Sequence, residues 1–541
     1  MTIVSRTVAD VHDTPVKTAT TIPISSNWAY DHVSTMHADV NLIGEPGELG
    51  FGVGIYPTNL PTGFNALSGT TDKASDNYGN YQYSDGSVMC WIPKFYYRIG
   101  SNTSPRYATY GNNAIDIVGT ETYSTANTAN AAGYALHRAF IDGGEEKSGF
   151  FFDKYQCSNN ANTASSIKNG NPLSTAAAHN PISGLTGTPT NAYHGTLVAA
   201  KTRGANFHLA SRFQYSALAL LATAHGQAAS SNTYCAWYDS GLTKNYPKGN
   251  NNNALSDADD TAVKWKSDGY SNCGKTGSAG YGGGAGNVFA KSTHNGQNCG
   301  VADLNGNMWE VSIGMTCIAT TNSVSGATKA NPCEITVTAA HGYSNNDVVM
   351  ITGVVGMTQL NDKLYTITVT ATDKFTLNGI DSSGYTDYAS AGTITKGTFY
   401  AAKESTAMKD FTPGTTLATD HWGSTGVNAM MKPVVPAFAT ASGINSIAQK
   451  YGNSTLQVLG EETSGNDWVL TGLGLPIING MSISGTNLFG IDLYYQYIRN
   501  ELCLISGGSW YSATGAGVWG LALDIRRGDS YAHVGFRAAY V

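Results

Sequence analysis

The C-terminal stretch from Ser506 to Val541 alternates glycine and large aromatic residues with residues that share no chemistry. Glycines let backbone segments approach closely, and Trp and Phe rings supply large buried areas, so we expect the first set to form a rigid frame. Because these large aromatic side chains need to be buried, we expect the last strands of the chain to pack in a core. The frame residues are Gly507, Gly508, Ser509, Trp510, Gly517, Trp519, Gly535, Phe536 and Arg537.

Between the frame residues lie aromatic, polar, acidic and aliphatic side chains, so no single catalytic or packing demand accounts for them. We interpret them as a surface that contacts a receptor. Tyr, Ser, Gly, Asp and His on a rigid scaffold are typical of binding surfaces, where Tyr gives contact area at low entropic cost. The intervening residues are Tyr511, Ser512, Gly515, Ala522, Asp524, Ile525, Asp529, Tyr531, Ala532 and His533.

This frame resembles the C-terminal half of the C-type-lectin-like fold that formylglycine-generating enzymes share with the target proteins of diversity-generating retroelements, where GGSW and GFR bracket the final strands. The segment CGVADLNGNMWEV, residues 299–311, is similar to the GLYDMxGNVWEW signature of the same fold. The resemblance implies an α+β, C-type-lectin-like (formylglycine-generating-enzyme-like) domain. Two distant signatures of one fold must converge, so we expect Trp309 to share a core with Trp510, Trp519 and Phe536. We expect Glu310 to be a buried hydrogen-bond acceptor.

The resemblance to retroelement targets has a further implication for the intervening residues. In those targets, error-prone reverse transcription rewrites adenines, mostly in asparagine codons. Each of the ten intervening residues can be reached from an AAC codon by changing its adenines. The resemblance therefore implies that these positions vary while the frame stays constant.

Two other segments resemble parts of phage tail proteins. DNYGNYQYSDGSVMCWIPKFYYRIG, residues 76–100, is similar to a segment of tail-fibre and tail-collar proteins. Residues 318–396 alternate apolar and polar residues between Gly, Asn and Asp turns, which predicts an inserted all-β module. Its AAHGYSNNDVVMITG segment resembles a small β-barrel repeat that is frequent in phage tail proteins.

These segments give the predicted domain order. Residues 1–85 form a β-rich N-terminal head for virion attachment or oligomerisation, and residues 86–317 form the first part of the lectin-like domain. The inserted module occupies residues 318–396, and residues 397–541 complete the lectin-like domain with its receptor-contacting surface.

The clearest helix signal runs from Ser211 to His225. Ser211 and Gln214 have capping-box spacing, apolar residues recur on one face, and Gly226 can close the end. We therefore expect an amphipathic helix that packs on a sheet. A second helix is expected around residues 444–450.

Composition excludes several classes of function. The formal net charge is −7, which leaves no basic surface for phosphate backbones, so no nucleic-acid partner is expected. The chain lacks a run of about 20 apolar residues, so no membrane insertion is expected. No signal-peptide core follows Met1, which predicts synthesis in the host cytoplasm, where buried free thiols are favoured over disulfides.

No enzymatic activity, cofactor or metal is predicted. The formylglycine-generating enzymes need a pair of reactive cysteines near the GGSW–GFR segment, and residues 506–537 contain no cysteine. The histidines lack ligand-like spacing. The acidic run of Asp257, Asp259 and Asp260 lacks the EF-hand pattern, which favours a solvated loop over a calcium site.

The sequence as a whole predicts a phage tail-fibre receptor-binding protein, an adhesin that attaches the virion to the host cell surface. The expected partners are a host receptor, either protein or glycan, and tail or baseplate proteins of the virion. The resemblance implies a homotrimer, and several fibres would raise the effective affinity through multivalency. The alternatives are a divergent, non-catalytic formylglycine-generating-enzyme-like protein and a structural baseplate or collar subunit.

Overall fold

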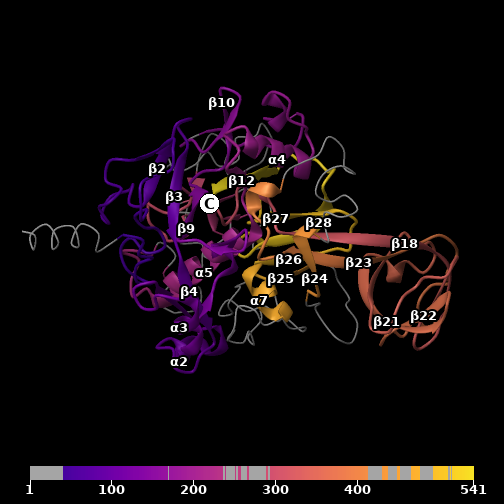
Figure 1. Cartoon of the computed structure of the whole chain (residues 1–541). Coiled ribbons are helices and arrows are strands. Elements are labelled where there is room, and N and C mark those ends of the chain that lie inside the picture. Colours follow the sequence, from indigo (N-terminus) through magenta and orange to yellow (C-terminus); the bar gives the residue numbers. More distant parts are fainter. Residues whose placement is uncertain are drawn as a thin grey trace, which may run out of the picture.

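The structure is a computed structural model in which β-sheets are the main regular structure of the described residues, which form one large core and a smaller lobe at one side (Figure 1). The residues that it describes are 40–168, 170–178, 180–235, 238, 250–251, 254–257, 265–266, 288–289, 293–411, 429–436, 448–450, 465–475, 492–509, 512 and 515–541.

The first six-stranded sheet brings the end of the chain into the middle of the molecule, where Figure 1 marks the C-terminus. The last strand, β30, pairs with both β9 and β12, so residues far apart in sequence meet there. β2 pairs with β3 across the predicted boundary at residue 85, so the described end of the head is part of this sheet. The strand order is β1 (Phe64–Ala66), β2 (Asn80–Tyr83), β3 (Val88–Pro93), β9 (Gly149–Asp153), β30 (Ala538–Tyr540) and β12 (Phe207–Leu209).

The second six-stranded sheet joins the GNMWEV segment to the C-terminal stretch. Trp309 lies opposite Val534 in a parallel pair, and Glu310 lies opposite Ser506 in an antiparallel pair. The strand order is β25 (Ala448–Lys450), β26 (Leu493–Gln496), β28 (Leu521–Arg526), β27 (Leu502–Ser506), β17 (Trp309–Ser312) and β29 (Val534–Phe536).

The smaller lobe is a closed β-barrel built from residues between Met315 and Ala402. The strands β18 and β23 pair with each other from Met315–Ala401 to Ser323–Thr393, so six strands of this seven-stranded sheet close into a barrel. The barrel has a hydrophobic core of its own, while Met350 of β20 and Leu364 of β21 pack in the main core. Around the barrel the order is β18 (Met315–Ala327), β19 (Glu334–Val337), β22 (Lys374–Leu377), β21 (Lys363–Ala371), β20 (Val348–Thr352) and β23 (Thr393–Ala402), and β24 (Met431–Val434) pairs with the far end of β23.

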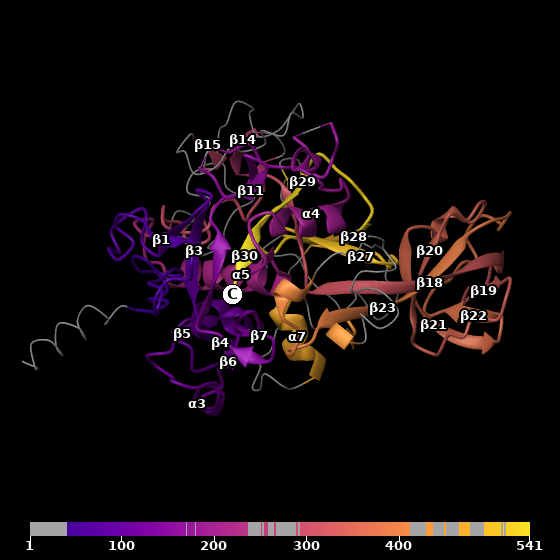
Figure 2. The same ribbon diagram turned by 45° about the horizontal axis from the view of Figure 1, so that its top comes forward.

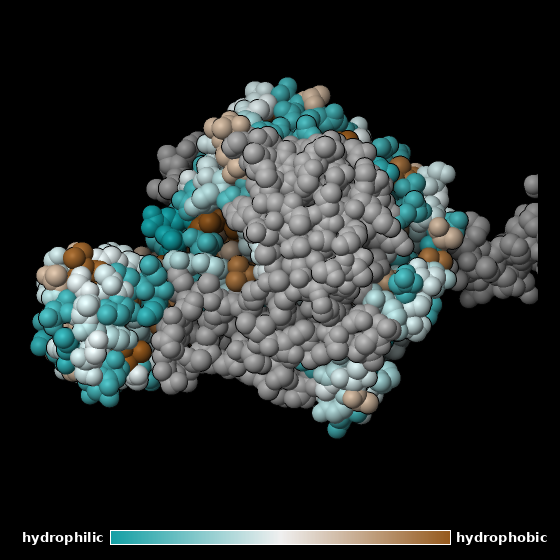
Figure 3. Space-filling model, turned by 180° about the vertical axis from the view of Figure 1, so that it is seen from behind, coloured by the Kyte–Doolittle hydropathy of each residue, from teal (hydrophilic) through white to brown (hydrophobic). Residues whose placement is uncertain are grey.

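Figure 2 shows β18 and β23 running from the main body into the barrel lobe. Seen from behind, the barrel surface at the left of Figure 3 is mostly hydrophilic or neutral, with hydrophobic residues scattered singly. Such a surface needs no covering partner on that side.

The longest helix in the described ranges is α5 (Arg212–Ala228). Ser211 caps this helix. Its hydroxyl accepts a hydrogen bond from the Gln214 backbone N–H, and Gln214 Oε1 accepts one from the Ser211 backbone N–H, which confirms the predicted capping box. The amphipathic interpretation was wrong, because α5 is buried on nearly all sides. Trp519 Nε1 donates to Thr223 Oγ1 at 2.9 Å, which ties α5 to the segment before β28.

Shorter elements complete the body. The segment at residues 444–450, where a helix was expected, ends in strand β25, and its earlier residues lie outside the described ones. A three-stranded sheet has the order β5 (Ile115–Gly119), β4 (Phe95–Ile99) and β6 (Ala135–Leu136), and the other helices are α2 (Tyr107–Tyr110), α3 (Ala126–Ala131), α4 (Ala192–Lys201) and α7 (Gly465–Gly472). Two-stranded pairs are β7 (Ile141–Asp142) with β8 (Glu145–Glu146), β10 (Ser158–Asn160) with β11 (Thr163–Ser165), β13 (Asn250–Asn251) with β14 (Ala254–Asp257), and β15 (Trp265–Lys266) with β16 (Val288–Phe289).

The expected α+β C-type-lectin-like fold class was wrong. The described residues form a β-rich arrangement of several sheets and a closed barrel, and α4 and α5 are its only helices longer than eight residues in those ranges. The physical reason is that Tyr, Phe, Val, Ile and Thr fill short segments bounded by Gly, Asn and Asp, a composition that favours strands and turns throughout the chain.

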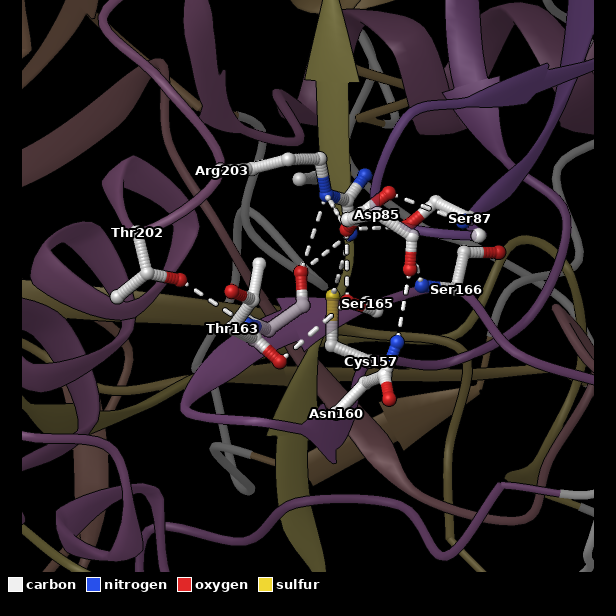
Figure 4. Close-up of polar contacts among 12 residues, drawn as sticks. Asp85, Ser87, Cys157, Asn160, Thr163, Ser165, Ser166, Thr202 and Arg203 are labelled. Atoms are coloured by element: carbon white, nitrogen blue, oxygen red, sulfur yellow. Dashed lines mark hydrogen bonds and ion pairs between the residues drawn. The ribbon is translucent and has the colours of Figure 1, made fainter.

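Buried ion pairs hold the strands in register. Arg203 is fully buried, and its guanidinium binds the Asp153 carboxylate at 2.6 Å and lies 3.2 Å from Asp85. Figure 4 shows this cluster, in which Ser87 and Ser165 both donate to Asp85. Its groups bind one another, so the cluster links β9, β11, the turn between β2 and β3, and the segment that follows α4.

Candidate functional site

A pocket of about 400 Å³ opens over one face of the second sheet. Six of the ten intervening residues line it, although they are spread over more than twenty positions of the sequence. These six are Ser512, Ala522, Asp524, Ile525, Tyr531 and His533. The other lining residues are Trp309, Leu493, Tyr495 and Ile505.

The floor of the pocket is set by strand register. Ala522 lies between Tyr495 of β26 and Ile505 of β27, and all three belong to the pocket lining. Alternate residues of a strand point to the same face, so Leu493 and Asp524 fall on the same side as Tyr495 and Ala522.

A β-bulge changes the register between β27 and β28 near Ile505. Bulges redirect side chains locally, and here both Asp524 and Ile525 line the pocket although they are adjacent in sequence.

The rim of the pocket is held by backbone contacts. Tyr531 donates its backbone N–H to Thr175 Oγ1 at 2.8 Å, and its carbonyl accepts from the same hydroxyl at 3.1 Å. The His533 carbonyl accepts from the Trp309 backbone N–H at 2.9 Å, so the rim segment is bonded to β17. The Tyr531 and His533 rings lie 5.3 Å apart between centroids. The two aromatic side chains therefore stand on a fixed backbone.

Burial sets the charge state of the polar groups in the pocket. It raises the pKa of Asp524, and the buried Asp524 Oδ1 has no hydrogen-bond partner among the described residues. Burial lowers the pKa of His533 to about 4, so its imidazole is neutral at pH 7. Tyr531 is 38% exposed and is one of the few exposed large hydrophobic side chains among the described residues. The pocket thus combines aromatic faces with a carboxylate oxygen that a ligand can satisfy.

The remaining intervening residues lie elsewhere. Gly515 is buried beside Leu493, with its N–H bonded to the Ser512 carbonyl. Asp529 belongs to a turn in which its carboxylate accepts from the Arg526 N–H at 2.8 Å, and it faces a different groove. Ala532 is half-buried between Tyr531 and His533. Tyr511 lies outside the described residues.

Most of the frame residues are buried as expected. Trp309, Trp519 and Phe536 belong to one core, which bears out that part of the predicted convergence, while Trp510 lies outside the described residues. Glu310 accepts hydrogen bonds from Gln156, Tyr215 and Arg537, which confirms its predicted role.

Sequence reasoning missed four of the ten lining residues. Leu493, Tyr495 and Ile505 were not predicted, and Trp309 was expected only in the core, where it is 6% exposed. The alternation of Leu493, Tyr495 and Tyr497 was an available signal for a strand with an aromatic face. Nothing in the sequence indicated that this strand lies beside β28.

The described residues contain no group of three or more His, Cys, Asp or Glu side chains placed to hold a metal ion. Among the same residues, no helix has the length and apolar character needed to cross a bilayer. The acidic run at 257–260 lies mostly outside the described residues, so the solvated loop expected there stays a prediction.

Comparison with known proteins gives a match only within the barrel. Residues 324–397 match the family model of the ubiquitin-activating enzyme E1 FCCH domain. This match covers the strands from the end of β18 to β23 and agrees with a compact all-β unit at this point of the chain. No curated protein matches the chain.

Proposed function

We propose that this chain is the receptor-binding protein of a phage tail fibre and that it attaches the virion to a host cell surface through the pocket over β26, β28, β27 and β17. The observation that carries the proposal is the gathering of six intervening residues around one pocket. In the sequence, those residues stand out only by their lack of shared chemistry. Four of the six are at least partly exposed, whereas Ala522 and Ile525 are only 3% and 5% exposed and belong to the buried floor.

The chemistry of the pocket supports adhesion rather than catalysis. Trp309, Tyr495 and Tyr531 supply aromatic contact area, and Asp524 and Ser512 supply directional polar groups. Strand pairing fixes the positions of the residues in the pocket floor, and the side chains of the intervening residues determine the chemistry of the pocket wall. That arrangement suits a site whose specificity changes while the fold is kept, as expected for the target of a diversity-generating retroelement.

The partners follow from the same proposal. The barrel and the N-terminal residues connect the receptor-binding part to tail or baseplate proteins, and a homotrimer presents three pockets per fibre. The intact protein would then act without an enzymatic step, a cofactor or membrane insertion.

Cell attachment of the labelled full-length protein tests the proposal. The double substitution Tyr531→Ala with Asp524→Asn removes an exposed ring and the carboxylate whose Oδ1 has no hydrogen-bond partner, without touching the frame. We expect it to reduce attachment to host cells at least about tenfold, since contacts of buried aromatic and charged groups dominate interfaces. Val355→Ala is the matched control, because Val355 is 51% exposed on the barrel and lies outside the pocket.

The control variant is expected to attach like the wild type. Equal attachment of the double variant and the wild type would contradict the proposal and favour a structural baseplate or collar subunit. Loss of attachment together with loss of cooperative unfolding would show that the pocket residues hold the fold instead.

A further inference from the structure

A second, larger cavity lies between the barrel and the main body. This groove has a volume of about 770 Å³ and shares no residue with the pocket. One wall comes from β18, β20 and β23 of the barrel. The other comes from the loop at 497–501 and the turn at 526–529. The groove is therefore a separate site, and a ligand bound there is independent of the proposed receptor attachment.

The barrel wall is a flat array of hydroxyl groups. Thr321 of β18 lies opposite Thr395 of β23, and Thr352 of β20 lies opposite Thr393 of β23. The alternate residues of these three adjacent strands share one face. Within the described part of the chain, none of these four hydroxyls hydrogen-bonds to another protein group, and all four residues line the groove.

The body wall adds planar polar groups that are supported by a stacked pair of aromatic rings. The Arg499 guanidinium lies 4.7 Å above the Tyr497 ring, and that ring stacks on Tyr495 with centroids 5.6 Å apart. Asn500 Oδ1 accepts from the Ala319 backbone N–H at 3.0 Å, so a side chain of this wall is bonded to the barrel. The two walls are thus held together at the base of the groove.

The charges of the groove balance. Three arginines and three acidic residues line it, and Arg527 Nε lies 3.5 Å from Glu501 Oε2. A balanced lining gives no net attraction for a polyanion or a polycation. The charged residues are Arg499, Arg526, Arg527, Asp362, Glu501 and Asp529.

We propose that this groove binds a neutral oligosaccharide. Each sugar hydroxyl donates and accepts, which matches the hydroxyl, amide and carboxylate groups of the two walls. An extended peptide fits less well, because the barrel is closed and offers no strand edge to pair with.

The double substitution Thr321→Val with Thr393→Val tests the proposal. Valine keeps the β-branched shape and removes only the hydroxyl. Titration calorimetry of the full-length protein with maltotriose, cellotriose, chitotriose and xylotriose, and with trigalacturonate as an acidic probe, measures binding. We expect at least one neutral trisaccharide to bind the wild type, and the double variant to bind it at least about fivefold more weakly, since two hydrogen bonds are lost.

Thr320→Val with Thr398→Val is the matched control. Both residues are exposed on β18 and β23 at positions that do not line the groove, so this variant is expected to bind like the wild type. Tyr531→Ala, which alters only the pocket, is also expected to leave trisaccharide binding unchanged. The proposal is overturned if no neutral trisaccharide binds, if only trigalacturonate binds, or if the Thr321→Val/Thr393→Val variant binds as tightly as the wild type.

Discussion

At the scale of single residues, the sequence predicted buried roles well and pocket roles poorly. Glu310 and Arg537 could be predicted because each belongs to a motif with a glycine or an aromatic residue that fixes its surroundings. Leu493 and Tyr495 could not, because their place in the pocket depends on which strand lies beside β28. That pairing is a long-range contact which no local pattern encodes.

The Glu310–Arg537 pair gives a stability prediction. The Arg537 guanidinium is fully buried and lies 2.8 Å from the Glu310 carboxylate. Arg537→Met would leave that carboxylate buried without its cation, so we expect the free energy of unfolding to fall by about 3–5 kcal/mol. Urea unfolding followed by tryptophan fluorescence measures this. Lys374→Met, which breaks the exposed pair with Glu334, is the control and should cost less than about 1 kcal/mol.

His225 gives a pH prediction. Its Nδ1 accepts from the Gly47 N–H at 3.0 Å, and burial lowers its pKa to about 4. Because the unfolded chain takes up a proton below about pH 6.5 and the folded chain does not, stability falls as the pH drops from 6.5 to 4. The loss attributable to His225 is at most roughly 3 kcal/mol.

Unfolding midpoints at pH 7.5, 6, 5 and 4.5 test this dependence. His225→Gln should be less stable than the wild type at pH 7.5 and should lose less stability on acidification. A variant with the same pH dependence as the wild type would show that His225 does not contribute.

At the scale of elements, sequence signals were reliable where both interacting residues are close together in the sequence. The capping box at Ser211 was predicted because both of its members lie within four residues. The burial of α5 on nearly all sides was not predicted, because the surrounding layers come from distant segments. Composition misled at residues 448–450, where a strand pairs with β26 in place of the expected helix.

The cap of α5 can be tested directly. Ser211→Ala removes the hydroxyl that accepts from the Gln214 N–H, and we expect a loss of about 1–2 kcal/mol in the free energy of unfolding. The matched control is Thr125→Ala, which removes the same type of cap from the short, exposed helix α3 and should cost less. Equal effects on both helices would mean that the burial of α5 adds nothing to the value of its cap.

At the scale of the whole molecule, the sequence indicated an inserted all-β unit but gave the wrong fold class for the rest. Strand-rich modules with their own turns can be recognised locally. The strand orders of the two six-stranded sheets could not, because the short motifs that suggested a lectin-like fold say little about sheet order.

The barrel should be removable. Most of its buried residues form a core of their own, with only Met350 and Leu364 of the deleted stretch in the main core, and Ser323 lies opposite Thr393 at the barrel end of the β18–β23 pair. Joining Ser323 to Thr393 through Asn-Gly should give a hairpin and a folded body, since short hairpin turns suit that dipeptide. Calorimetry should show the main unfolding transition within a few degrees of the wild type. Loss of cooperative unfolding would mean that the barrel and the body fold as one unit.

The central claim is that the intervening residues form a variable pocket on a constant frame. Deep sequencing of the coding stretch for residues 506–537 in a propagated phage population tests it most directly. We predict substitutions at adenine-derived positions that cluster at the pocket residues Ser512, Ala522, Asp524, Ile525, Tyr531 and His533, with Trp519, Phe536 and Arg537 unchanged. Substitutions spread evenly over frame and pocket, or absent from the pocket, would contradict it.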